Sequence, residues 1–234
     1  MICISVAAFG QPFFDTASVK PADPKHRGTR MIDDPGTLMM NSASLLYCIV
    51  WAYDIKDYQV QGPDWIKTEI YDIIAKTETP VPGNVHKAML QALLAERFKL
   101  TAHRETKDIP IYALAVGKNG PNFRASKTEG TPDIQSGRDG SLIGGKISMA
   151  KLADAISGPW MQRPVLDRTG LEGTYDLVLN PMPYLRDGPD GDGKPDMEYA
   201  IGRALQGLGL KLEPAKAPFE ILVIDHVEKI PSRN

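Results

Sequence analysis

Four stretches of the chain repeat apolar residues at the three- and four-residue spacing of an amphipathic helix. They follow Ser44, Asn84, Ser148 and Asp196, and serine and aspartate side chains are good caps for a helix N-terminus. A Gly-Pro pair then ends the third stretch. These patterns predict four helices, whose apolar positions are Leu45, Leu46, Ile49, Val50 and Tyr53, then Val85, Met89, Leu90, Leu93 and Leu94, then Met149, Leu152, Ala153 and Ile156, and finally Met197, Ile201, Ala204, Leu205 and Leu208.

Short runs of branched and aromatic residues between the helices predict strands. They cover residues 58–60, 70–75 and 111–116 in the first half, and residues 165–166, 174–179 and 219–224 in the second half. The polar run at 103–109 and the proline-bounded run at 214–218 predict a hairpin turn before the last strand of each half.

The two halves therefore carry the same elements in the same order, from about Thr37 to Val116 and from about Lys146 to Ile224. A Tyr-Asp pair occurs at 71–72 and again at 175–176, and the helix exit Phe98-Lys99-Leu100 matches Leu210-Lys211-Leu212 at a constant offset. Helix stripes and strand faces need a common partner to bury against. We predict an α+β fold of two tandem pseudo-repeats, each an antiparallel sheet with two helices packed on one face. Chance similarity of amphipathic stretches is the alternative.

The predicted organisation has four parts. Residues 1–11 are predicted as the remnant of a secretory signal peptide, because the first ten residues are mostly apolar and uncharged and polar Gln11 follows them. Residues 12–117 form the first repeat, 118–145 a glycine-rich linker, and 146–234 the second repeat with an acidic loop at 180–196. A signal peptide places the protein in the periplasm or outside the cell. A buried first strand is the other interpretation of residues 1–11.

Composition excludes several classes of protein. The chain of 234 residues has 27 basic and 29 acidic side chains, and the formal net charge of -2 argues against a nucleic-acid binder. No apolar run reaches the roughly 18–20 residues of a transmembrane helix. Cys3 and Cys48 form no Cys-x-x-Cys pair, so a redox or zinc-cysteine site is not expected.

The acidic loop carries the best candidate for a metal site. Asp190, Asp192 and Asp196, with Glu198, lie among glycines that let a loop wrap around an ion. Ca²⁺ takes about 6–8 oxygen ligands, so we predict a calcium site here, although the match to an EF-hand loop is incomplete. A solvated loop is the alternative, and Asp196 can also cap the last helix.

Candidate general bases lie at the ends of two predicted strands. His103 ends one, and Asp225-His226 follows another. A histidine titrates near neutral pH and can move protons there, so we select His226, Asp225 and His103 as candidate catalytic residues. Exposed strand-end histidines are the alternative. The chain lacks the Gly-x-Ser-x-Gly elbow of an α/β-hydrolase and the His-Glu-x-x-His motif of a zinc protease.

Five ordered motifs are spread over nearly the whole chain after residue 11. They are FDTASVKP at 14–21, GPDWI at 62–66, LQALLAERFKL at 90–100, RPVLDRTGL at 163–171 and GLKLEP at 209–214. Together they resemble a family known as the soil-associated proteins, a domain of unknown function abundant in soil Acidobacteria. The helix–strand pattern of each half is also similar to the short N-terminal domains of secretins, as an analogy of fold alone.

The resemblance implies an exported protein. Some members carry the domain behind a membrane metallopeptidase similar to the beta-lactam sensor, which implies extracytoplasmic sensing. The family also includes soil-metagenome members linked to calcium-dependent opening of acyl-homoserine lactones. It supplies no catalytic motif that can be transferred to this chain residue by residue.

Two classes of function follow. The resemblance implies a lactonase or esterase that acts on a small acyl ester or lactone with the help of calcium. The residues alone show no assembled catalytic set, and they favour a non-catalytic module that binds an extracytoplasmic ligand such as a peptide, a glycan or a partner protein.

Overall fold

The computed structural model describes residues 12–25, 28–127, 129–157, 161, 163–188 and 193–232. The predicted signal remnant at 1–11 and the predicted ligands Asp190 and Asp192 lie outside this range. Across the described residues the protein is α+β, with four α-helices and three four-stranded sheets whose pairings are mostly antiparallel.

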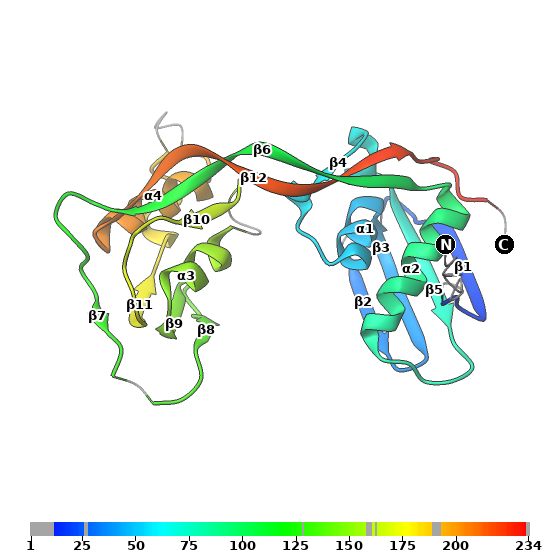
Figure 1. Ribbon diagram of the computed structural model, residues 1–234, viewed down its shortest axis with the longest axis horizontal. Helices are drawn as coiled ribbons and strands as arrows, with labels where there is room; N and C mark the ends of the chain where they lie inside the picture. The colour runs from blue at the N-terminus through cyan, green and yellow to red at the C-terminus, as the bar shows by residue number, and fades with distance from the viewer. Residues whose placement is uncertain are drawn as a thin grey trace, which may run out of the picture. The chain divides into compact units, whose positions relative to one another are not determined.

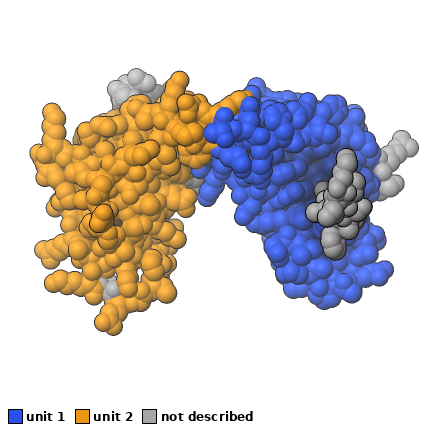
Figure 2. Space-filling view, in the orientation of Figure 1, with its two compact units in different colours: residues 1–106, 220–234 blue, residues 107–219 orange. Residues whose placement is uncertain are grey.

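The chain divides into two compact units, which Figure 2 shows in different colours. Unit 1 comprises residues 1–106 and 220–234, and unit 2 comprises residues 107–219. The chain leaves unit 1 within β6 (Thr101–Val116) and returns to it within β12 (Leu210–His226). The segment 118–145, predicted as a linker, contributes strands to unit 2.

Unit 1 is built on a sheet of order β1-β5-β3-β2. Helices α1 and α2 pack against each other on one side of this sheet (Figure 1). The buried core between sheet and helices includes Tyr71 and Phe98, whose rings meet edge to face at 4.8 Å. The elements are β1 (Thr16–Pro21), β2 (Arg30–Asp34), β3 (Thr37–Ser44), α1 (Leu45–Tyr53), η1 (Asp57–Gln59), β4 (Val60–Gln61), η2 (Asp64–Lys67), β5 (Ile70–Lys76) and α2 (Gly83–Phe98).

Unit 2 has a sheet of order β7-β11-β9-β8. Its core joins this sheet to helices α3 and α4, and includes Leu152, Leu179 and Leu205. Leu114 of β6 and Leu210 of β12 are buried in the same core. The elements are β7 (Arg124–Ala125), β8 (Asp133–Ser136), β9 (Leu142–Ile147), α3 (Met149–Ile156), β10 (Val165–Asp167), β11 (Tyr175–Leu179), η3 (Met182–Tyr184) and α4 (Met197–Gly207).

The third sheet has the order β10-β6-β12-β4. In unit 2, β10 pairs in parallel with β6 at 112–114, and in unit 1, β4 pairs in parallel with β12 at 222–223. The hairpin turns predicted at 103–109 and 214–218 are wrong, because β6 and β12 run through both segments without a break. A proline is tolerated in a strand where its nitrogen faces no neighbouring strand.

The first helix of each unit, α1 in unit 1 and α3 in unit 2, begins in the same way. Ser44 accepts a hydrogen bond from the Tyr47 amide, and Ser148 accepts one from the Lys151 amide, each at 3.1 Å. These contacts satisfy amides that a helix N-terminus leaves free, so both predicted caps are confirmed.

The residues that follow α2 and α4 do not match in the way that the sequence predicts. Lys99, which follows α2, has left-handed backbone with φ 53°, and Gly209, which follows α4, has φ 74°. Lys211 lies inside β12. The predicted match of Lys99 with Lys211 is therefore wrong, and Gly209 has the backbone conformation that resembles Lys99.

Candidate functional site

A cavity of about 440 Å³ in unit 2 contains two of the four predicted metal ligands. Asp196 is the N-cap of α4, and its carboxylate accepts a hydrogen bond of 2.9 Å from the Tyr199 amide. Glu198 lies in the first turn of the same helix, where a negative charge is favourable. The lining residues are Tyr112, Arg163, Asp196, Glu198, Tyr199, Gly202 and Leu212.

Tyr112 connects the long strand β6 to this helix end. Its hydroxyl donates a hydrogen bond to the Glu198 carboxylate, and the Arg163 guanidinium lies 5.4 Å from the centre of its ring. The hydrogen bond to Glu198 and then burial raise the pKa of Tyr112, and the charge of Arg163 opposes them. The phenol therefore stays protonated and donates to Glu198 at neutral pH.

The described ends of the acidic loop are tied together at the rim of this cavity. The Asp196 amide donates a hydrogen bond of 2.9 Å to the Leu185 carbonyl. A Cβ atom on Gly188 would lie 3.8 Å from the Asp196 Cβ. Leu185 and Gly188, which precede the part of the loop outside the described residues, therefore lie beside Asp196, which follows it.

The donors present at the cavity suit calcium in kind, because they are carboxylate oxygens. Asp196 and Glu198 alone supply too few oxygens to surround the ion. Among the residues that the structure describes, no group of three or more His, Cys, Asp or Glu side chains is placed to hold a metal. A complete site would need the loop residues Asp190 and Asp192.

The structure brings two of the three predicted catalytic residues together in unit 1. The His103 Nδ1 atom lies 2.9 and 3.0 Å from the two carboxylate oxygens of Asp225. Both side chains are about half exposed, at 53% and 48%. His226 instead has its Nε2 atom 3.8 Å from Glu228. Asp225 can orient the His103 imidazole, and an oriented imidazole is one requirement for general-base catalysis.

A buried histidine was not selected from the sequence. His86, in the first turn of α2, is fully buried, and its Nδ1 atom lies 2.6 Å from an Asp33 oxygen on β2. Its Nε2 atom is also buried and has no hydrogen-bond partner among the described residues. His86 lies three and four residues before Met89 and Leu90, so the helical spacing could have placed it on the apolar face. The pair ties β2 to α2.

The chain belongs to a family described as "Protein of unknown function (DUF3738)", whose pattern it matches over residues 46–227. The match begins in α1 and ends just after β12, so it includes the cavity of unit 2 and the His103–Asp225 pair. The search of curated proteins finds no significant match. The search of solved structures also finds none. None of the described helices is both long and apolar enough to span a membrane.

Proposed function

We propose that this protein is an exported enzyme of a soil bacterium that opens N-acyl-homoserine lactones with the help of calcium, at the cavity of unit 2. The main support is that Asp196 and Glu198, selected from the sequence as metal ligands, line one cavity together with Tyr112 and Arg163. The substrate class comes from the resemblance of the sequence motifs to the soil-associated proteins.

In this proposal Asp196, with Asp190 and Asp192 of the loop, would hold the ion. Calcium, when bound, supplies a positive charge that polarises the lactone carbonyl. The Glu198 carboxylate takes a proton from the attacking water, and the Tyr112 hydroxyl keeps that carboxylate oriented.

Arg163 provides a cation for the negative charge that develops on the carbonyl oxygen. The new bond joins the water oxygen to the carbonyl carbon, and the ester carbon–oxygen bond of the ring breaks. The ring oxygen takes the proton held by Glu198 and leaves as the alcohol of the opened N-acyl-homoserine, and the new carboxylic acid releases its proton to solvent.

Ring opening by the purified chain tests this proposal. The lactone and its opened product are separated by chromatography, with the protein stripped of metal by a chelator and then resupplied with Ca²⁺. We expect turnover only with Ca²⁺, and a loss on the order of 10²-fold in Glu198→Gln, because its amide keeps the Tyr112 contact but cannot take a proton. Asp154→Asn, on the exposed side of α3, is the matched control. Full turnover in the chelator, or in Glu198→Gln, would contradict the proposal.

A second candidate is a non-catalytic extracytoplasmic binding or sensor module. It is favoured by the half exposure of the His103–Asp225 pair and by the small number of carboxylates that the described part of the cavity supplies. His103→Gln separates the possibilities further. Turnover that depends on His103 and not on Glu198 would move the reaction to unit 1, and no turnover with any variant would leave the binding module.

We also infer that the two units are pseudo-repeats of one ancestral unit. The order β1-β5-β3-β2 corresponds strand by strand to β7-β11-β9-β8. The capping serines Ser44 and Ser148 have the same separation along the chain as Asp72 and Asp176. An experimental structure in which the two units do not superimpose along these elements would contradict the inference.

A further inference from the structure

The edge strand of the sheet is complete in unit 1 and short in unit 2. In unit 1, β1 pairs with β5 along six residues, with Lys20 opposite Asp72. In unit 2, β7 pairs with β11 along two residues, with Arg124 opposite Asp176. The position of β7 therefore matches only the last part of β1, and among the described residues no strand takes the place of the rest of β1 beside β11.

The residues that precede β7 do not continue along β11, because they form hydrogen bonds with the end of α4 instead. The Asn122 amide donates a hydrogen bond of 2.9 Å to the Leu208 carbonyl, and the Gly117 amide donates one of 2.8 Å to the Gly209 carbonyl. A Cβ atom on Gly209 would lie 1.9 Å from the Gly120 carbonyl oxygen, so only glycine allows this approach. Close packing against Gly209 thus holds the residues before β7 at the end of α4 and away from β11.

One edge of β11 consequently has no partner strand beyond Asp176 among the described residues. Leu177, Val178 and Leu179 pair with β9, and among the described residues no strand pairs with them on the other side. The Ser126 amide donates to the Thr174 carbonyl, and backbone groups alternate along an antiparallel strand. The Val178 amide and carbonyl therefore face the open edge.

Ile74 of β5 is the residue of unit 1 that corresponds to Val178, and the same edge of its strand is paired. In β5 the Ala22 amide donates to the Ile70 carbonyl, so by the same alternation the backbone of Ile74 faces β1. Ser18 of β1 is its partner in the register. Unit 1 thus contains a bound strand at the place that is open in unit 2.

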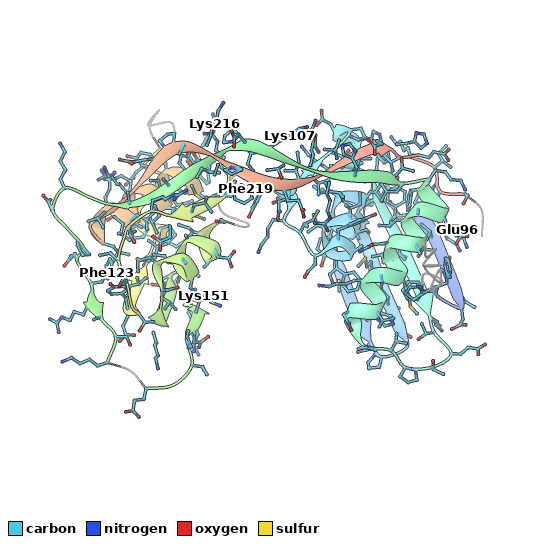
Figure 3. All side chains as sticks on the ribbon, in the orientation of Figure 1. Glu96, Lys107, Phe123, Lys151, Lys216 and Phe219 are labelled. Atoms are coloured by element: carbon cyan, nitrogen blue, oxygen red, sulfur yellow. The ribbon has the colours of Figure 1, made fainter. Side chains whose placement is uncertain are left out.

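A groove of about 620 Å³ lies along the open edge of β11. Its apolar part includes Phe123, labelled in Figure 3, with Val178 and Ile143, which are 53% and 44% exposed. Arg124 and Lys127 are exposed cations that line the same groove, and Asp176 is the carboxylate there. The groove therefore combines strand edge, apolar surface and a net positive charge.

We propose that this groove binds an extended acidic segment of a partner polypeptide, which adds to β11 as an antiparallel strand beside Val178 with a carboxylate near Arg124 and Lys127. Strand addition supplies main-chain hydrogen bonds, and the side-chain surface supplies the selectivity. A second copy of β1 fits less well, because its Lys20 would bring a further cation to this groove. The proposal does not depend on lactone hydrolysis.

The test is a selection of nine-residue peptides from a random displayed library on the full chain. The counter-selection uses Val178→Pro, which removes the edge amide and leaves the pairing with β9 intact. We expect enriched peptides to alternate apolar residues and to carry an acidic residue. Their affinity should fall at least ten-fold in an Arg124→Glu, Lys127→Glu double variant, and amide NMR shifts should change at Leu177–Leu179.

Several outcomes would overturn the proposal. These are no enrichment over Val178→Pro, peptides that bind both proteins equally, or shifts that lie away from β11. Self-association that Val178→Pro abolishes would make a second copy the occupant. If a fluorescent fatty acid binds wild type and Val178→Pro equally well and no peptide is enriched, the groove would be a lipid site. The double variant keeps the test valid if the proline variant does not fold.

Discussion

Asp72 and Asp176 each hold the amide of a residue with left-handed backbone. The Ser42 amide donates to Asp72, and the Lys146 amide donates to Asp176, each at 2.8 Å. Ser42 and Lys146 have φ values of 50° and 53°, which are uncommon for residues other than glycine. Each contact lies where the register of the sheet shifts, two residues before a capping serine. The aspartate of the recurring Tyr-Asp pair is therefore explained by local structure.

Replacing either aspartate by alanine should destabilise its unit. We expect Asp72→Ala to cost about 1.5–3 kcal/mol, the range for a hydrogen bond to a charged group, and Asp176→Ala to cost less because its contact is exposed. Asp72→Asn and Asp176→Asn keep an acceptor oxygen and should lose less. Urea unfolding measures these differences, and equal stability of all four variants with wild type would refute the role of the carboxylates.

At the level of elements, the same β-strand position has a partner in unit 1 and none in the described part of unit 2. The backbone amide and carbonyl of Ile74 face β1, whereas those of Val178 face the edge of β11 that has no described partner strand. Proline removes one backbone donor, and its cost depends on whether that donor is used. The two positions therefore form a matched pair of sites.

We expect Ile74→Pro to lower the free energy of unfolding by about 1–3 kcal/mol, because it removes a backbone donor used in the pairing of β1 with β5 and leaves the acceptor without a partner. Val178→Pro should change stability much less. Both are measured by chemical denaturation, with Ile74→Ala and Val178→Ala as controls for the lost side chain. A Val178→Pro variant that is as unstable as Ile74→Pro would mean that the β11 edge is already paired.

The sequence predicted elements better than their connections. Helices after Ser44 and Ser148 were identified from the apolar spacing and the caps, and both are confirmed. The continuous course of β6 and β12 was missed, because polar residues and prolines resemble turns when the neighbouring strand is unknown. The short strands β7 and β8 were missed because glycine-rich sequence carries little periodicity.

The candidate site was predictable only in part. Asp196 and Glu198 were selected from the acidic loop, and they do line a cavity. Tyr112 and Arg163, which share this cavity, were not selected, because they lie far from the loop in the sequence and no local pattern connects them to it. His103 and Asp225 were selected at the ends of different strands, and their contact depends on the pairing of β6 with β12.

At the scale of the whole molecule, the C-terminal residues complete unit 1. The Glu228 amide donates to the Phe98 carbonyl, and the Ser232 amide donates to the Arg97 carbonyl, each at 2.7 Å. The buried Tyr71 also donates its hydroxyl to the Lys229 carbonyl at 2.7 Å. Unit 1 therefore depends on residues that lie more than 100 positions along the chain from its helices.

Deletion of residues 228–234 should destabilise unit 1 selectively. The three lost hydrogen bonds contribute about 0.5–1.5 kcal/mol each, so we expect a loss of roughly 2–4 kcal/mol. Amide hydrogen exchange measures the two units separately, and faster exchange should appear in β5 and α2 but not in β9 and α3. Equal acceleration in both units, or in neither, would contradict this assignment.

The central claim is that the cavity beside α4 holds calcium, and calorimetric titration of Ca²⁺ into the metal-free protein tests it most directly. Asp196→Ser keeps an N-cap but removes the carboxylate, Glu198→Gln keeps the contact with Tyr112, and Asp154→Asn is the control. We predict saturable binding of one ion to wild type and to Asp154→Asn, with affinity at least ten-fold weaker in Asp196→Ser. Glu198→Gln should bind the ion nearly as well as wild type, because its carboxylate acts on the water and does not hold the ion. No binding to wild type, or unchanged affinity in Asp196→Ser, would contradict the claim.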